Sequence, residues 1–579
     1  MRSSMVAESL TGARWEMREV DEGAQERLRA GLNVSRVTAR ALLCRGIQEV
    51  EEGARFLGHD LAGLVDPFEM QDMGPAVEAV EGALARGEPI RVYGDYDVDG
   101  VCATALLVRA LGGLGGQVDW YIPHRVDEGY GVNEEAVRQA SAEGVKLLIT
   151  VDCGSTATSE VELARELGMG VVVTDHHRPG EELPQAPVLD PWRSDCGYPF
   201  KDLAGVGVAF KLVSALARAR GLPEGTELRF LDLVCLGTVG DVVPLLGENR
   251  LFVQHGLERL SNTRKVGVRA LLSAAGLAAG KAVGARQVAF GLAPRINAAG
   301  RMEDARAAVT LLLTQDAEEA RQLAEALSEH NTRRRQEEQQ TLGEAEKMVS
   351  EGVDLSRERV IVLGSETWHP GVIGIVASRL VERYHRPALL IAIQDGKGKG
   401  SGRSVAGLNL WEALRECASC LTRYGGHRYA AGFGVEADQI GELRRRINEV
   451  SAERLAMDDL VRHIETDAEA ELGEIGQEEV SELNRLAPFG MGNREPVLVT
   501  RGVRVEDATR VGDGSHLALR LRDEQGTGAG AIWFRQGEQG ARLPVGAKVD
   551  VCYRPRLDEW NGRVRVQLQI EDVAVHGGE

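Results

Sequence analysis

Three short apolar runs in the first third of the chain each end near an acidic residue and lead into a stretch with helical periodicity. The runs are Ile90–Tyr93, Lys146–Val151 and Val171–Thr174. Strands that alternate with helices of this length form a mostly parallel sheet. Ligands of such sheets bind beyond the carboxyl ends of the strands, and the acids lie at those ends. The sequence therefore predicts an α/β core with a polar site at one edge of a parallel sheet.

The chain has the length for several domains and the composition of a folded protein. Its 579 residues are 43% hydrophobic and 27% charged, and its eight cysteines are widely spread. Such spacing is typical of reduced thiols rather than of a disulfide framework. The sequence has no run of about 18 apolar residues and no secretory signal pattern. We therefore predict a cytoplasmic protein that does not associate with membranes.

The net charge of −20 excludes a uniformly basic surface for nucleic acid. The charge is unevenly distributed, because residues 497–579 contain 12 Lys plus Arg and 12 Asp plus Glu. The acidic excess thus belongs to the first 496 residues, either as solvated surface or as metal ligands.

The pattern of elements changes along the chain and predicts five segments. They are a helical, acidic segment (1–75), the parallel-sheet core (76–315), a connector helix (316–352), a second α/β domain (353–462) and a region of short alternating strands (463–579). The connector is predicted because Asp316 and Glu319 fit a capping box and residues 332–340 are almost wholly polar. The last segment reads as a small β-barrel or sandwich, since Asn561-Gly562 is a hairpin signal.

The clearest chemical motif is Tyr93–Gly100, in which Asp95, Asp97 and Asp99 alternate directly after an expected strand. Three neighbouring carboxylates repel one another unless a cation lies between them. Ligand sets rich in oxygen select Mg²⁺ or Mn²⁺. Two other interpretations are a solvated acidic turn and a calcium loop. The calcium loop requires a glutamate at its twelfth position, where this chain has Leu106.

Three further motifs place acids or imidazoles at the ends of expected strands. Asp152 follows one, Asp175-His176-His177 follow the next, and Asp241 follows another. Alone, Asp152 fits a helix cap equally well, and the two histidines fit a polar surface loop. Together the motifs can fill two metal sites, and the imidazoles favour Mn²⁺. Two metals about 4 Å apart can clamp a phosphoryl displacement, and we predict that Asp152 bridges them.

The four motifs resemble the core of the DHH phosphoesterase family. The runs Pro294–Met302, Ser401–Ser404 and Tyr424–His427 resemble, within that family, the bacterial exonucleases specific for single-stranded DNA. The resemblance covers almost the whole chain from about residue 40. It implies a DHH core, a connector helix, a DHH-associated substrate-binding domain and a C-terminal OB-like barrel that binds nucleic acid.

The resemblance also implies roles for individual residues. The implied metal ligands are Asp95, Asp97, Asp99, Asp152, His176 and Asp241. All of these except Asp95 are implied to be catalytic, together with His177, which would face the scissile phosphate. Asp175 would orient a histidine. Many relatives have a histidine where this chain has Tyr93, and a tyrosine is a poor ligand for these metals.

We expect Tyr93 to border the substrate instead. Further implied substrate-binding residues are Arg125, Arg301, Ser401, Arg403 and His427, of which Ser401 and Arg403 would form a 5′-phosphate pocket. In the barrel, Trp533, Phe534 and Tyr553 lie near arginines and fit either a stacking platform for bases or a hydrophobic core.

The implied activity is a two-metal exonuclease, with Mn²⁺ or Mg²⁺, that degrades single-stranded DNA from the 5′ end into 5′-mononucleotides. The implied context is recombination and DNA repair, with a monomeric enzyme and with a helicase and a single-strand-binding protein as partners. The alternatives are a phosphodiesterase for short RNA or cyclic dinucleotides, an inactive scaffold that binds single strands, and an inorganic pyrophosphatase. Against them stand the chain's length and barrel, its complete set of motif acids and histidines, and its arginines.

Overall fold

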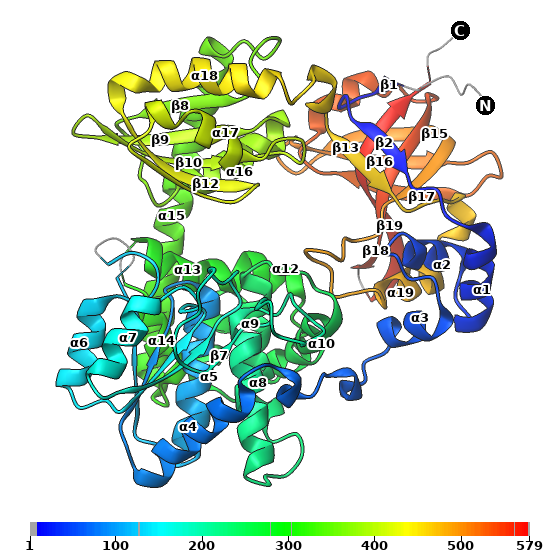
Figure 1. Cartoon of the computed structure of the whole chain (residues 1–579). Helices are drawn as coiled ribbons and strands as arrows, with labels where there is room; N and C mark the ends of the chain where they lie inside the picture. The colour runs from blue at the N-terminus through cyan, green and yellow to red at the C-terminus, as the bar shows by residue number, and fades with distance from the viewer. Residues whose placement is uncertain (1–7, 125–127, 278–279, 303, 561, 577–579) are drawn as a thin grey trace. The chain divides into compact units, whose positions relative to one another are not determined.

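The computed structural model describes residues 8–124, 128–277, 280–302, 304–560 and 562–576 (Figure 1). The chain forms two compact units. We call Ala54–Thr332 with Leu486–Glu495 the parallel-sheet unit, and Met1–Gly53 with Arg333–Arg485 and Pro496–Glu579 the barrel unit. None of the helices among the described residues is long and apolar enough to cross a lipid bilayer.

The parallel-sheet unit is built on five strands in the order β4-β3-β5-β6-β7, all of them parallel. The strands are β3 (Ile90–Tyr93), β4 (Val118–Tyr121), β5 (Leu147–Val151), β6 (Gly170–Thr174) and β7 (Val188–Leu189). Every residue of β3 and β5 is buried, as expected for a sheet covered on both faces. The predicted parallel-sheet core is confirmed.

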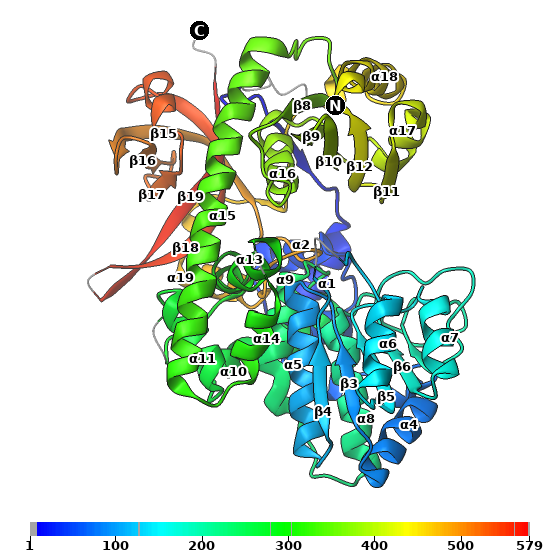
Figure 2. The same cartoon turned by 90° about the vertical axis from the view of Figure 1, so that its left-hand side faces the viewer.

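Two hydrophobic clusters cover the faces of this sheet. The larger contains α4 (Met73–Arg86), α5 (Val98–Gly113), α8 (Gly205–Ala219) and α9 (Leu231–Gly240), and the smaller contains α6 (Glu134–Ala142) and α7 (Thr158–Glu166). Helix α9 is buried on all sides, because its sequence is apolar all round. Figure 2 shows α5 beside β4 and β3. The helices that follow are α10 (Gly247–Ser261), α11 (Val266–Ala274), α13 (Ala293–Met302) and α14 (Arg306–Leu313).

Helix α15 (Ala317–Gly352) is the predicted connector, and it passes from the parallel-sheet unit into the barrel unit. Asp316 caps it by accepting hydrogen bonds from the backbone N–H groups of Glu318 and Glu319, each at 2.8 Å. The predicted capping box is incomplete. The Asp316 N–H donates to the Thr314 hydroxyl instead, and that hydroxyl donates to the Glu319 carboxylate.

The second α/β region has a five-stranded sheet in the order β11-β12-β10-β9-β8. Its strands are β8 (Ile361–Ser365), β9 (Ala388–Gln394), β10 (Lys397–Arg403), β11 (Arg423–Gly426) and β12 (Ala430–Glu436), with helices α16 (Ile373–Tyr384), α17 (Leu410–Glu416) and α18 (Ile440–Ala452). Only β8 and β9 pair in parallel. Gly400 of β10 is required, because a Cβ there would lie 2.2 Å from the Phe433 ring.

The C-terminal strands close into a barrel through the pairs β15–β16, β16–β17, β17–β19, β19–β18 and β18–β15. The strands are β15 (Leu498–Val511), β16 (His516–Arg522), β17 (Gly528–Trp533), β18 (Lys548–Trp560) and β19 (Arg563–Val575). Strands β17 and β19 pair in parallel, and the other four pairs are antiparallel. The predicted OB-like barrel is confirmed, and it closes with five strands.

The N-terminal segment contains strands as well as the predicted helices α1 (Glu22–Leu32), α2 (Arg36–Leu43) and α3 (Val50–Leu57). Strand β1 (Glu8–Ser9) pairs with β19, and β2 (Arg14–Met17) pairs with β13 (His463–Thr466). The sequence did not predict these strands, because their side chains have no alternation strong enough to signal one.

Candidate metal centre

The first acidic motif follows β3 and forms the start of α5. The Asp97 carboxylate caps α5 by accepting hydrogen bonds from the N–H groups of Asp99, at 2.9 Å, and Gly100, at 3.2 Å. The Asp99 carboxylate is fully buried and accepts hydrogen bonds from Gly205 N, at 2.6 Å, and Val206 N, at 3.0 Å, at the beginning of α8. The positive end of the α8 dipole therefore faces Asp99.

Asp152 directly follows β5 and has a φ of 61°. Aspartate tolerates this left-handed conformation better than most residues do. Two glycines make room around the acids. A Cβ on Gly205 would lie 2.8 Å from the Asp152 side chain, and one on Gly237 would lie 2.6 Å from Asp99 Oδ1. The local sequence thus allows buried carboxylates to approach backbone closely.

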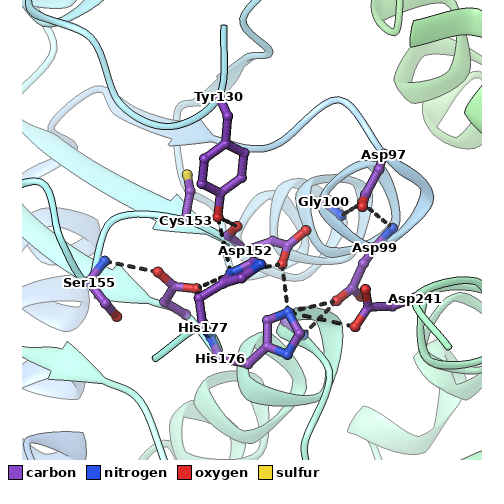
Figure 3. Close-up of polar contacts among 12 residues, drawn as sticks. Asp97, Asp99, Gly100, Tyr130, Asp152, Cys153, Ser155, His176, His177 and Asp241 are labelled. Atoms are coloured by element: carbon purple, nitrogen blue, oxygen red, sulfur yellow. Dashed lines mark hydrogen bonds and ion pairs between the residues drawn. The ribbon is translucent and has the colours of Figure 1, made fainter. Parts of the chain in front are cut away.

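Asp152, Asp99, His176 and Asp241 converge at the carboxyl end of the sheet (Figure 3). His176 Nε2 lies 3.1 Å from Asp152 Oδ1, 3.6 Å from Asp241 Oδ2 and 3.9 Å from Asp99 Oδ2. The position of Asp241 differs from the prediction. It caps the carboxyl end of helix α9 rather than following a strand. A buried apolar helix of ten residues has the same sequence signature as a buried strand and its flanks.

The donor set fits two divalent cations. Three groups of side chains place one ligand atom each within 4.8 Å of the others: Asp95/Asp97/Asp152, Asp99/His176/Asp241 and Asp152/His176/His177. Asp152 belongs to two of these groups, one of which contains Asp95 and Asp97 of the first motif. The buried atoms Asp152 Oδ1 and His176 Nε2 have no hydrogen-bond partner, although they face each other. Oxygen atoms with one or two imidazole nitrogens suit Mn²⁺ or Mg²⁺.

The electrostatics of the cluster favour a cation in the same place. Burial raises the pKa of Asp99, Asp152 and Asp241, and the neighbouring carboxylates raise it further for Asp99 and Asp152. Each of these groups is therefore costly to ionise in isolation. A divalent cation among them would favour the ionised carboxylates.

Asp175 and His177 form a second layer beside the cluster. The Asp175 carboxylate accepts hydrogen bonds from the backbone N–H groups of Ser155, at 2.9 Å, and His176, at 2.7 Å, and lies 2.9 Å from His177 Nδ1. Burial lowers the pKa of His177, but Asp175 and the nearby carboxylates outweigh it and raise this pKa to about 9. Asp175 is absent from the three groups, so its contacts support the predicted role of orienting a histidine.

Tyr130 lies at the same site and was not predicted there. Its hydroxyl is 3.1 Å from His177 Nδ1 and donates to the Asp152 carbonyl at 3.2 Å. Its ring contacts the His177 ring edge-on at a centroid distance of 5.6 Å. The signal in the sequence is the pair of flanking glycines, Gly129 and Gly131, both with φ near 90°.

The predicted substrate-binding residues of the parallel-sheet unit differ in burial and position. Tyr93 is buried, and its hydroxyl donates to the Gly131 carbonyl at 3.0 Å. This position does not support the predicted contact with substrate, and Tyr93 instead supports the loop that carries Tyr130. Arg301 lies half-buried in the last turn of α13. Arg125 lies outside the described residues.

Ser401, Arg403 and His427 come together in the sheet of the second α/β region. Ser401 and Arg403 lie on β10, and Arg403 is the register partner of Ala430, to whose carbonyl the His427 N–H donates at 2.8 Å. Arg403 Nη1 donates to Ser401 Oγ at 3.3 Å, and burial lowers the pKa of Arg403. Gly374, at the start of α16, leaves space beside both side chains, since a Cβ there would lie 2.9 Å from Ser401 Oγ.

The aromatic residues of the barrel divide between the two interpretations. Trp533 and Tyr553 are buried, so they belong to the core and not to a stacking platform. Phe534 is 49% exposed and contacts the His516 ring edge-on at 5.3 Å. Only Phe534 of these three is available to a base.

Comparisons with known proteins agree with this architecture. Residues 89–238 match the DHH family, N-terminal domain, residues 357–453 match the DHHA1 domain, and residues 466–572 match the RecJ OB domain. The chain is 40% identical to the single-stranded-DNA-specific exonuclease RecJ of Bacillus subtilis over 567 residues, which is 97% of this chain and 71% of that protein.

Two crystal structures of RecJ from Thermus thermophilus are also similar. One, in complex with Mn²⁺, has a TM-score of 0.82 and 35% identity, and the match covers 98% of this chain and 80% of that one. The other, in complex with Mg²⁺, has a TM-score of 0.78 and 34% identity, with 98% and 79% covered. With three matched domains and this identity over nearly its whole length, the chain belongs to the RecJ exonuclease family of DHH phosphoesterases.

Proposed function

We propose that this protein is a metal-dependent exonuclease that degrades single-stranded DNA from its 5′ end to 5′-mononucleotides. The observation that carries the proposal is the sharing of Asp152 between two groups of ligand atoms at one edge of the parallel sheet. This arrangement suits two cations bridged by one carboxylate. The metal ligands are Asp95, Asp97, Asp99, Asp152, His176 and Asp241, and the cations are Mn²⁺ or Mg²⁺.

When bound, two divalent cations supply Lewis-acid stabilisation of the attacking and leaving oxygens of a phosphodiester. The protein contributes the geometry. The α8 N-terminus holds Asp99, the turn after β5 holds Asp152, and Asp175 fixes the ring of His177. His177 is 45% exposed, so it can donate a hydrogen bond to a phosphate oxygen of the scissile bond.

The direction of degradation rests on the second α/β region. Ser401 and Arg403 offer a hydroxyl and a planar guanidinium to a phosphate, beside glycine backbone that a Cβ would obstruct. His427 lies on the connection between the neighbouring strands β11 and β12. We assign this pocket to the 5′-phosphate of the strand. In the parallel-sheet unit, Arg125 and Arg301 are proposed to bind phosphates of the strand. The barrel holds the incoming strand, with Phe534 as a stacking residue.

The biological setting is part of the proposal. A nuclease specific for single strands acts where duplex DNA has been opened, in recombination and repair. A helicase and a single-strand-binding protein are therefore suitable partners, and the cytoplasm that contains bacterial DNA is the suitable location. We propose that the enzyme acts as a monomer.

The test uses a long single-stranded DNA with a labelled 5′ phosphate, with Mn²⁺ and then with Mg²⁺. The intact chain is compared with Asp152→Ala, and duplex DNA of the same sequence is the substrate control. We expect mononucleotides to appear from the 5′ end of the single strand, and neither the variant nor the duplex reaction to release them.

Other outcomes would overturn the proposal in different ways. Tight binding without cleavage in either metal would indicate an inactive scaffold. Cleavage limited to oligomers of a few nucleotides would indicate a short-oligonucleotide phosphodiesterase. Release of nucleotides from the 3′ end would refute the assignment of the 5′-phosphate pocket.

A further inference from the structure

A loop from the C-terminal third of the chain is part of the parallel-sheet unit. The loop is Leu486–Glu495, and it lies in the sequence between α19 (Gln477–Asn484) and the first barrel strand, β15. Its Met491 carbonyl accepts a hydrogen bond of 2.8 Å from Leu245 N, four residues beyond the metal-centre residue Asp241. We call this segment the Met491 loop.

The Met491 loop is held in one conformation by its own polar groups. Asn493 is fully buried, and its side-chain amide donates to the carbonyls of Leu486 and Pro488, each at 2.8 Å. Gly490 N donates to the Asn493 carbonyl at 2.9 Å. Gly492 has a φ of 71°, and a Cβ there would lie 3.0 Å from the Pro244 side chain. The backbone of Met491 is therefore positioned before any ligand arrives.

The loop is also bonded to the helix that follows the metal centre. The buried Arg250 of α10 donates through Nη1 to the Leu486 carbonyl at 2.7 Å, and Gln254 donates to the Ala487 carbonyl at 3.4 Å. These bonds, with that from Leu245, join the N-terminal end and the middle of the loop to the segment after Asp241. A loop with this many buried partners has a fixed position in its unit.

Two apolar side chains are nevertheless exposed here. Met491 is 54% exposed, and Val242, which directly follows Asp241, is 59% exposed. Val242 has a φ of 66°, a conformation that is strained for a β-branched residue and that occurs mostly at functional sites. One exposed apolar side chain is ordinary. Two on segments joined by a backbone hydrogen bond, one of them strained and adjacent to a metal-centre residue, call for a ligand with an apolar surface.

We propose that Met491 and Val242 form an apolar ledge that receives a nucleobase of the unpaired strand whose phosphate lies at the metal centre. This inference rests on the proposed function. A thioether packs favourably on aromatic rings, and the flexible methionine side chain adapts to rings of different size. Neither side chain has a hydrogen-bond donor, so the ledge does not select among bases. In a duplex both faces of every internal base are covered by stacking and its edge is held by pairing, so the ledge favours unpaired nucleotides.

The test measures kcat and KM on a 5′-phosphorylated single strand for the intact chain, Met491→Ala, Met491→Leu and Phe68→Ala. Phe68 is the matched control, because it is 46% exposed in the same unit and belongs to η2 (Pro67–Glu69). We expect Met491→Ala to raise KM about fivefold, from the loss of roughly 40 Å² of apolar contact. Met491→Leu should restore a KM near that of the intact chain, and Phe68→Ala should leave KM unchanged.

The same enzymes are then tested on a strand whose first three nucleotides lack their bases. On this strand the KM of the intact chain should rise by about the same fivefold. The KM of Met491→Ala should rise little beyond its value on the normal strand. A merely structural role for Met491 would give two independent, multiplicative losses and would overturn the inference. An unchanged KM in Met491→Ala would overturn it too. Failure of the intact chain to degrade the normal strand would instead refute the proposed function.

Discussion

The two five-stranded sheets of this protein concentrate opposite charges. The parallel sheet gathers carboxylates at its carboxyl edge, and burial raises the pKa of Asp99, Asp152 and Asp241. The mixed sheet of the second α/β region holds Arg403, whose pKa burial lowers. In both places the protein has removed water from a charged group without supplying a full charge of the opposite sign.

The difference lies in how each sheet makes room for its ligand. In the parallel sheet, strands end at one edge, so acids from separate strands and helices meet there. In the mixed sheet, Gly374 at the start of α16 leaves room beside the Ser401 hydroxyl and the Arg403 guanidinium on β10. The first arrangement suits small cations, and the second suits a phosphate with its three oxygen atoms. The comparison predicts that substitutions in the two sheets impair activity in different ways: those in the parallel sheet through the metal, and those in the mixed sheet through the 5′ phosphate.

The largest loss of activity is expected from substitution of a metal ligand, and it should exceed the loss from substitution of Asp175, which orients the neighbouring His177. Asp99→Asn should lower kcat/KM by about 10³-fold, or roughly 4 kcal/mol, because Lewis-acid stabilisation is lost. Asp175→Asn should lower it only about 10- to 100-fold, because it disturbs His177 and not the cations. Initial rates of nucleotide release in Mn²⁺ measure both, with the cap Asp60→Asn as the control. Equal losses in the two variants would remove the distinction.

The next effect is thermal stabilisation by metal. Mn²⁺ at 100 times its dissociation constant should stabilise the parallel-sheet unit by about 2.7 kcal/mol. Asp152→Asn should abolish this gain. Without metal, however, that variant should be more stable than the intact chain, because Asp152 Oδ1 makes no hydrogen bond to lose and its charge repels its neighbours. Calorimetry of both proteins, with EDTA and with Mn²⁺, measures the stabilisation by metal and the stability difference in its absence. Destabilisation of the metal-free variant would contradict the electrostatic account.

A smaller effect is expected in the mixed sheet and should depend on the end of the DNA. Arg403→Gln should lower kcat/KM by about 2 kcal/mol, or roughly 30-fold, on 5′-phosphorylated DNA, because a charged hydrogen bond to phosphate is lost. DNA with a 5′ hydroxyl should show little change. Arg445→Gln on the exposed face of α18 is the control. The same loss on both substrates would show that Arg403 does not read the 5′ phosphate.

The smallest effect is the pH dependence of the metal-free protein. Asp152 has a folded-state pKa above its ordinary value of 3.8. The stability that this group contributes is therefore fully present below pH 3.8 and is lost as the pH rises through the folded-state pKa. The advantage of Asp152→Asn in EDTA should accordingly be absent in acid and appear as the pH rises. Unfolding temperatures of the variant and of the intact chain across this pH range measure the difference in stability. A difference that is largest in acid would contradict the raised pKa of Asp152.

The sequence predicted the parts of the site that follow strands. Asp95, Asp152 and His176 were placed correctly at strand ends because a buried parallel strand is a short apolar run with a sharp end. Asp241 was expected in a similar place, but it caps a helix. A buried strand and an apolar helix that is buried on all sides look alike in the sequence. Tyr130 was missed because its contacts with Asp152 and His177 join residues more than 20 positions apart, and the flanking Gly129 and Gly131 signal a turn but not what that turn contacts.

The barrel shows a similar limit. Its alternating strands were predicted, and the expected turn at Asn561-Gly562 includes Asn561, which lies outside the described residues. Trp533 is the last residue of β17 and is buried, whereas Phe534 lies in the turn that follows and is exposed, so alternation along the strand does not decide between them. The pairing of β1 with β19 joins residues more than 500 positions apart, which no short-range pattern can predict.

That pairing has a consequence for how the protein is made. Glu8 and Ser9 leave the ribosome more than 500 residues before their partners Val575 and Ala574. The barrel cannot close before β19 is synthesised, so β1 has no partner strand while the intervening residues are made. Contacts over such distances form slowly and leave strand edges open to wrong partners. Assembly of the barrel unit therefore depends on the synthesis of β19, and until then β1 must be kept from pairing with other strands.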